Sequence, residues 1–127
     1  MTTRSCVVLC KDGQLLMVRQ MYKGEELWTF PGGRIEADET PVQAAVREVY
    51  EETGLEVEIV EPILEYYNDR IKGMYYCYRG ITTGGNLKLG MDPELSEPEQ
   101  ELQEVRWRPL DTVMDNTEVK RILPYIR

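Results

Sequence analysis

The sequence predicts a single α/β or α+β domain over residues 1–127, in which helices cover a β-sheet. Short apolar runs of the kind that form strands recur along most of the chain, and turn residues separate them. Two segments have the length and the end signals of helices. A chain of 127 residues is also the usual size of one domain around one hydrophobic core.

The N-terminal part predicts a hairpin followed by a third, shorter strand. Ser5–Cys10 and Leu15–Arg19 are apolar runs, and the Asp-Gly pair within residues 11–14 suits the tight turn between them. Leu27–Phe30 is β-prone and ends at Pro31-Gly32-Gly33, where we expect the backbone to turn sharply.

The segment Thr40–Thr53 predicts a helix with a clear signal at each end. Thr40 is a good capping residue, and Pro41 suits the first helical position because its missing N–H is not needed there. Gly54 suits the position just past the last turn, where a left-handed backbone is common.

The C-terminal half predicts further strands, one long loop and a closing helix. The predicted strands are Leu55–Val60, Ile63–Asn68, Met74–Thr82 and Glu101–Trp107. Residues 83–100 lack periodicity and contain glycines and prolines, which predicts a long loop, and loops of that length are often functional. The closing helix is expected over Thr112–Ile126, interrupted or ended near Pro124.

The predicted helix Thr40–Thr53 carries the most specific chemical signal. Glu48, Glu51 and Glu52 are three and four residues apart, so they share one face of the helix. Carboxylates without histidine or thiolate form a hard-oxygen site, which suits Mg²⁺ or Mn²⁺ better than zinc. Arg47 precedes Glu51 by four residues and can hold that carboxylate as an ion pair. The alternative is a solvated acidic face in a glutamate-rich protein.

Composition excludes several other kinds of chemistry. The chain has no histidine, which excludes imidazole metal sites and Ser-His-Asp triads. Its formal net charge of −8 offers no basic surface for nucleic acid. A protein this acidic needs local arginines or bound cations if its substrate carries phosphates.

The segment from Gly33 to Leu55 resembles the Nudix box, Gly-x5-Glu-x7-Arg-Glu-U-x-Glu-Glu-x-Gly-U, where U is a bulky aliphatic residue. The residues at its fixed positions are Gly33, Glu39, Arg47, Glu48, Val49, Glu51, Glu52, Gly54 and Leu55. Similar segments of Nudix proteins correspond to residues 15–19, 28–33 and 104–107. The resemblance implies a Nudix-type α/β/α sandwich around a mixed β-sheet, and hydrolysis of nucleoside-diphosphate-linked compounds by a metal-activated water.

The same resemblance implies roles for individual residues. The metal ligands would be Glu48, Glu51, Glu52 and the carbonyl group of Gly32, with Mg²⁺ or Mn²⁺ as cofactor. The catalytic set would be Arg47, Glu51, Glu52 and Glu101, with a carboxylate as the general base.

Two further positions stay open in this assignment. Glu39 is expected to support the loop before the helix rather than to touch metal. Glu104 and the acidic residues 94–99 are alternatives to Glu101 as a base or ligand outside the box.

Residues outside the box indicate which substrate class to expect. Arg70 stands where ADP-ribose hydrolases carry a proline, and residues 71–73 lack the tyrosine of dinucleoside polyphosphate hydrolases. The MutT-like group remains, with Arg19, Phe30 and Asn116 as substrate-binding candidates. We therefore expect a nucleoside triphosphate, a purine or its oxidised form, to be cut to monophosphate and pyrophosphate.

Two of the substrate-binding candidates have an alternative structural interpretation, and the predicted activity also has alternatives. Asn116 is also well placed to cap the last helix, and Phe30 is also a typical sheet-core residue. The alternatives to the activity are an ADP-ribose or nucleotide-sugar pyrophosphatase, and a Nudix-fold module that binds nucleotides without turnover.

The remaining sequence features concern location and assembly. Cys6, Cys10 and Cys77 lack CxxC spacing, so we expect reduced thiols packed on strands. No secretory signal is evident, and no apolar run reaches the roughly 18 residues of a membrane span. We expect a cytoplasmic protein with a small nucleotide as partner, without nucleic-acid or membrane partners. The sequence is compatible with a homodimer as well as with a monomer.

Overall fold

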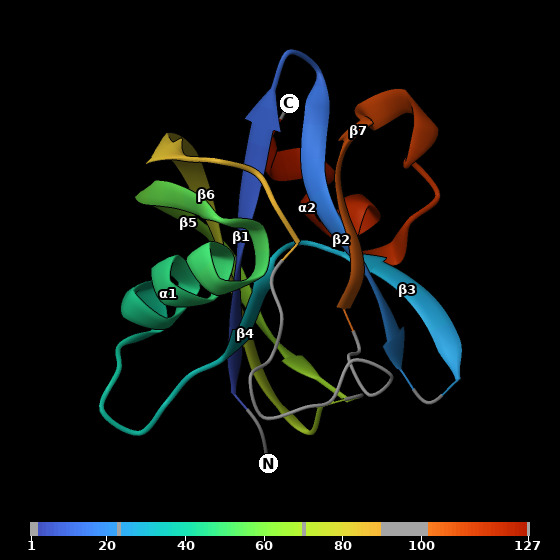
Figure 1. Cartoon of the computed structure of the whole chain (residues 1–127). Coiled ribbons are helices and arrows are strands. Elements are labelled where there is room, and N and C mark those ends of the chain that lie inside the picture. The colour runs from blue at the N-terminus through green and yellow to red at the C-terminus, as the bar shows by residue number, and fades with distance from the viewer. Residues whose placement is uncertain (1–2, 23, 70, 90–101, 127) are drawn as a thin grey trace.

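A computed structural model describes residues 3–22, 24–69, 71–89 and 102–126. It contains a mixed sheet with one helix on each face (Figure 1), which confirms the expected α/β/α sandwich. In chain order the elements are β1 (Arg4–Lys11), β2 (Gln14–Tyr22), β3 (Glu25–Thr29), β4 (Gly32–Arg34), α1 (Pro41–Thr53), β5 (Leu55–Asn68), β6 (Gly73–Gly85), β7 (Leu102–Pro109), the 3₁₀ turn η2 (Leu110–Thr112) and α2 (Thr117–Ile126).

Strands β1 and β2 diverge, and this divergence shapes the site. The strand order is β3-β2-β1-β6-β5, with β4 also paired to β1 and β7 also paired to β2. The two strands pair only at their hairpin end, where Cys10 lies opposite Leu15. The first part of β1 pairs with β4 and, in parallel, with β6. β2 pairs with β7 from Gln14 to Gln20 and with β3 from Val18 to Tyr22.

Alternating residues of β1 point to opposite faces of the sheet, as strand geometry requires. Val7 and Leu9 pack in a cluster with Ala45 and Val49 of α1. The buried members of this cluster are Val7, Leu9, Leu16, Ala45, Val49, Leu55 and Val57. Cys6 and Val8 belong to the cluster that contains Val119 and Ile122 of α2. Full burial of such a side chain stabilises the fold by about 1.5–3 kcal/mol. The sheet therefore separates two hydrophobic layers, one under each helix.

The ends of α1 agree with the sequence prediction. The Thr40 hydroxyl accepts from the Gln43 N–H at 3.1 Å, and the Gln43 side chain accepts from the Thr40 N–H at 2.9 Å. This reciprocal pair is a capping box, and Pro41 occupies the first turn. Gly54 has φ of 77°, and its N–H bonds to the Tyr50 carbonyl.

The closing helix is shorter than the prediction of Thr112–Ile126. It begins at Thr117, and the residues before it form the 3₁₀ turn and a bend. Pro124 lies inside α2 and does not end it. It stands in the last turn, where only a little helix follows the proline.

The two strands predicted on either side of Pro62 form one continuous strand, and the first residues of the predicted loop 83–100 belong to a strand. β5 is continuous over Pro62, with register shifts that mark bulges along it. A proline is tolerated here because β5 is the last strand in the order, and no described strand pairs with its other edge. β6 extends to Gly85, whereas residues 90–101, including Glu101, lie outside the described residues. Gly32–Arg34 forms a short strand, although we expected only a turn at Pro31-Gly32-Gly33.

Two of the three cysteines are strand-packed thiols, as expected. Cys6 and Cys77 are buried opposite each other on β1 and β6, with their sulfur atoms 2.8 Å apart. Cys10 is free but exposed. Within the described parts of the chain, neither helix is long and apolar enough to cross a membrane.

Candidate active site

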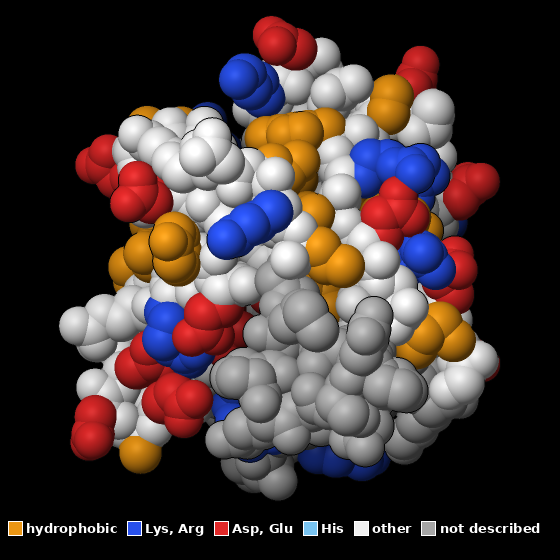
Figure 2. All heavy atoms as spheres, viewed as in Figure 1, with side chains coloured by type: hydrophobic (Ala, Val, Ile, Leu, Met, Phe, Trp, Pro, Cys, Tyr) orange, Lys and Arg blue, Asp and Glu red, His pale blue; other side chains and the backbone are white. Residues whose placement is uncertain are grey.

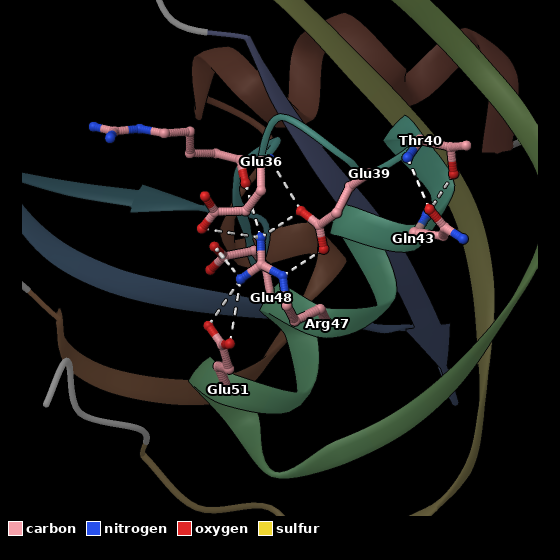
Figure 3. Close-up of polar contacts among 8 residues, drawn as sticks. Glu36, Glu39, Thr40, Gln43, Arg47, Glu48 and Glu51 are labelled. Atoms are coloured by element: carbon pink, nitrogen blue, oxygen red, sulfur yellow. Dashed lines mark hydrogen bonds and ion pairs between the residues drawn. The ribbon is translucent and has the colours of Figure 1, made fainter.

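The guanidinium group of Arg47 organises the acidic face of α1 (Figure 3). It binds Glu39 through two contacts, Nε at 2.6 Å and Nη2 at 2.8 Å, and Nη2 also donates to the Arg34 carbonyl at 3.0 Å. Its Nη1 donates to Glu48 at 3.0 Å and to Glu51 at 3.1 Å. The expected ion pair between Arg47 and Glu51 is confirmed.

Arg47 favours the charged form of both Glu39 and Glu48, but burial outweighs its effect at Glu48. The hydrogen bonds from Arg47 lower the pKa of Glu39 to about 2, so Glu39 stays charged. Burial raises the pKa of Glu48, although Arg47 opposes that shift. On the surface, acidic side chains gather beside basic ones in this region (Figure 2).

The backbone of β4 lies directly against the acidic face. A Cβ atom on Gly33 would come within 2.4 Å of the Glu48 carboxyl carbon. A side chain at this position would therefore force the Glu48 carboxylate to move from its present place.

Glu52 is bound to the same strand and forms no ion pair with a described residue. Its carboxylate accepts from the Gly32 N–H at 2.8 Å. Burial raises the pKa of Glu52 to about 8, and the charges of Glu48 and Glu51 add to that effect. The hydrogen bond from Gly32 and the charge of Arg4 oppose the shift. A nearby cation would restore the charged form.

The three carboxylates share one side of α1 but face different partners. Glu48 and Glu51 turn toward Arg47, whereas Glu52 turns toward Gly32. Within the described residues, no three acidic or cysteine side chains are already gathered as a metal site. The donor chemistry nevertheless fits Mg²⁺ or Mn²⁺, because it consists of carboxylate and backbone oxygens, and Glu52 forms no ion pair with a described residue.

A cleft adjoins the acidic face where β1 and β2 diverge. Its lining comes from five strands, from α1 and from neighbouring turns: Arg4, Val18, Gln20, Leu27, Thr29, Phe30, Gly32, Glu52, Ile71 and Tyr75. The enclosed volume is about 70 Å³, well below the roughly 300–1,000 Å³ of typical ligand pockets. The enclosed part accommodates a small group, so most of a nucleotide would lie outside it.

The three predicted substrate residues lie in different surroundings. Phe30 is only 2% exposed and lines the cleft, so it is at once a core residue and a wall of the site. Arg19 does not line the cleft; its guanidinium binds Glu104 at 3.1 Å and Glu26 at 3.3 Å.

Asn116 acts as a helix cap in this structure, which is the alternative stated above. Its side-chain oxygen accepts from the N–H groups of Glu118 at 2.8 Å and Val119 at 3.1 Å. Its amide nitrogen donates to the Trp28 carbonyl at 2.8 Å. Reading a base edge would require these contacts to break, so the geometry gives the base-reading role no support.

Of the candidates for a base outside the box, only Glu104 lies within the described residues. Glu104 is bound to both Arg19 and Arg106. Glu101 and residues 94–99 lie outside the described residues. The cleft residues Arg4, Gln20, Thr29 and Tyr75 were not identified from the sequence, because no local motif marks them.

The NUDIX domain model matches residues 1–126, which is almost the whole chain. The chain belongs to the Nudix family. Its acidic helix, the glycines of β4 and the capped ends of α1 are therefore the Nudix box seen in three dimensions.

Curated relatives match over parts of their length. A MutT-like protein from Streptomyces ambofaciens is 47% identical over 79 residues, which cover 62% of this chain and 50% of that protein. Phosphatase NudJ from Escherichia coli K12 is 49% identical over 53 residues, which cover 42% of this chain and 34% of NudJ. The matched segments thus span half of these relatives or less.

Solved structures show the same fold. A NUDIX-family hydrolase from Clostridium perfringens matches 97% of this chain and 91% of its own, with a TM-score of 0.72 and 19% identity. An ADP-ribose pyrophosphatase from Streptococcus suis matches 87% of this chain and 75% of its own, with a TM-score of 0.69 and 20% identity. At these identities the likeness concerns the fold.

Proposed function

We propose that this Nudix protein hydrolyses a phosphoanhydride bond in a nucleoside-diphosphate-linked compound and depends on Mg²⁺ or Mn²⁺. The observation that carries the proposal is Glu52. Its carboxylate is held by the Gly32 N–H beside Glu48, and burial raises its pKa to about 8. An acid in that position is useful when a cation binds next to it.

The proposed ligands are the carboxylates of Glu48, Glu51 and Glu52 and the carbonyl group of Gly32. Nudix hydrolases in general use divalent metal ions. Bound Mg²⁺ supplies positive charge and Lewis acidity to the diphosphate oxygens. Its own charge also lets an acidic protein accept an anionic substrate.

Arg47 is proposed as a positioning residue. Its two contacts to Glu39 and its contact to the Arg34 carbonyl anchor the guanidinium on the loop before α1. Its Nη1 then orients Glu48 and Glu51 from that anchor. The contacts to Glu39 can persist while those carboxylates turn toward a cation.

The proton of the attacking water goes to a carboxylate, for which we propose Glu51, Glu52 or Glu101. In this reaction one P–O bond forms to the water oxygen as the bridging P–O bond to the leaving group, pyrophosphate or the nucleoside monophosphate, breaks. Glu52 already lies at the junction of the acidic face and the cleft. Glu101 remains a proposal from the sequence alone.

The proposed substrate is a nucleoside triphosphate, a purine or its oxidised form, cut to monophosphate and pyrophosphate. The similarity to a MutT-like protein supports this choice. Phe30 and the apolar walls of the cleft would contact the organic part of the substrate. Arg19 would reach a phosphate only after leaving its two carboxylate partners.

The test is a hydrolysis panel run compound by compound with Mg²⁺ and again with excess EDTA. It should include nucleoside triphosphates, oxidised purine nucleotides, ADP-ribose and nucleotide sugars. We expect hydrolysis with Mg²⁺, loss of hydrolysis with EDTA, and the highest kcat/KM for a purine triphosphate. Turnover that persists in excess EDTA would contradict the metal dependence. A strong preference for ADP-ribose would overturn the substrate alone.

A further inference from the structure

Arg4 is a partly buried cation in the cleft that the acidic-face chemistry leaves unused. It opens β1, and its backbone is fixed from both sides, opposite Arg34 of β4 and Tyr75 of β6. Among the residues that line the cleft, it is the one with a positive charge. A fixed strand position therefore presents a guanidinium beside the site.

The side chain of Arg4 differs from most arginines in the described parts of the chain. An ion pair with a carboxylate is formed by Arg19, Arg47, Arg79, Arg106 and Arg121. Arg4 has no side-chain hydrogen bond or ion pair with any described residue. A partly buried guanidinium without a partner costs free energy, and an anion that enters the cleft would offset that cost.

The charge of Arg4 reaches the proposed metal-binding carboxylates. Burial raises the pKa values of Glu52 and Glu48, and Arg4 is among the groups that lower both. Glu52 and Arg4 also line the same cleft. A diphosphate bound to cations at Glu52 would therefore lie within the field of Arg4.

We propose that Arg4 is a substrate-binding residue whose guanidinium pairs with a phosphoryl oxygen of the substrate in the cleft between β1 and β2. This proposal rests on the proposed function, because it places the phosphates between the cations on α1 and Arg4. The planar guanidinium offers paired N–H groups that match phosphate oxygens.

The experiment measures binding of inorganic pyrophosphate with saturating Mg²⁺ by calorimetry. The proteins are wild type, Arg4→Gln and Arg79→Gln, whose arginine is exposed and paired with Glu61 on β6 and β5. We expect Arg4→Gln to weaken pyrophosphate binding about 10-fold to 100-fold, as loss of a charged contact does, and Arg79→Gln to change it less than about 2-fold. Unchanged binding by Arg4→Gln, or no binding by wild type, would overturn the proposal.

A second readout separates substrate binding from upkeep of the acidic face. Mn²⁺ binding, followed by electron paramagnetic resonance without pyrophosphate, should stay within about 3-fold of wild type in Arg4→Gln. Equal losses of Mn²⁺ and pyrophosphate binding would mean that Arg4 only maintains the carboxylates, which contradicts the proposal. If Arg4→Gln does not fold, Arg4→Lys takes its place, and wild-type pyrophosphate affinity in that variant would contradict a guanidinium contact.

Kinetics on the best substrate of the panel complete the test. Arg4→Gln should raise KM about 10-fold or more and change kcat less than about 3-fold, because the contact is present before and during the reaction. If the panel shows no hydrolysis while pyrophosphate binding still depends on Arg4, the proposed enzymatic activity fails and the anion site stands.

Discussion

The acidic face of α1 and the cleft beside it differ in how far apart in the sequence their residues lie. The acidic face comes from one continuous segment, in which helix periodicity and two caps place Glu48, Glu51 and Glu52 together. The cleft comes from strands far apart in the chain, and Arg4 and Tyr75 meet only because β1 and β6 pair in parallel. A local pattern can therefore reveal the first region, whereas only the register of the sheet reveals the second.

The two regions also differ in whether their charged side chains form ion pairs. On the acidic face, one guanidinium holds Glu39, Glu48 and Glu51. In the cleft, Arg4 and Glu52 both line the wall but form no ion pair with each other. Arg47 thus contacts three carboxylates on the acidic face, whereas Glu52, where the two regions meet, forms no ion pair with a described residue.

The largest effect is expected where the regions meet. Glu52→Gln keeps the shape of the side chain but removes a negative charge from the proposed metal site. We expect kcat to fall about 10²-fold to 10⁴-fold, the usual range for loss of a base or an electrostatic contact. The control is Glu58→Gln, an exposed carboxylate on β5, which should retain wild-type kinetics. Wild-type kinetics in Glu52→Gln would remove that residue from the mechanism.

The contacts of Arg47 on the acidic face predict an effect on the unfolding free energy. Arg47→Ala removes the contacts to three carboxylates and one carbonyl group, and it leaves Glu39 and Glu48, each with a side chain 17% exposed, without their cation. We expect the metal-free protein to lose about 2–4 kcal/mol of unfolding free energy in urea titrations. Arg79→Ala breaks an exposed pair with Glu61 and should cost less than about 1 kcal/mol. Equal losses in the two variants would contradict a special role for Arg47.

The charge on Glu52 predicts a pH dependence of stability in EDTA. Its pKa rises from the ordinary value of 4.5 to about 8 in the folded chain, mainly because of burial. The wild-type fold should therefore lose stability as the pH rises from 4.5 to 8, since the unfolded chain releases that proton first. Glu52→Gln has no such ionisable group. The unfolding free energy of this variant, relative to that of wild type, should therefore grow across that pH window by on the order of 1–3 kcal/mol. Urea titrations at several pH values measure it, and a constant difference would refute the buried-acid account.

The smallest effect distinguishes the two readings of Asn116. Because its side chain caps α2 and binds the Trp28 carbonyl, Asn116→Ala should lower the unfolding free energy by about 1–2 kcal/mol. All substrates should be affected alike. A change of purine preference by about 1–3 kcal/mol without loss of stability would instead favour base reading.

The sequence was most informative where structure is local. The caps of α1 and the pair between Arg47 and Glu51 follow from spacing along one helix. The prediction of two strands around Pro62 was wrong, because a proline is tolerated on an edge strand and no sequence pattern reveals which strand lies at the edge.

The site was less predictable where several elements converge. Arg19 matched a phosphate-binding position, but β3 and β7 place Glu26 and Glu104 beside it. Arg4 gave no signal, because its role depends on which strands flank β1. Long-range pairing decides both cases, and spacing along the chain does not encode it.

Direct titration with Mn²⁺, followed by electron paramagnetic resonance at pH 8, tests the central claim that the acidic face of α1 holds the cation. The account predicts that wild type and Glu58→Gln bind Mn²⁺ equally, that Mg²⁺ displaces it, and that Glu52→Gln binds at least about 10-fold more weakly. Absence of binding in wild type, or equal binding in Glu52→Gln, would contradict the account.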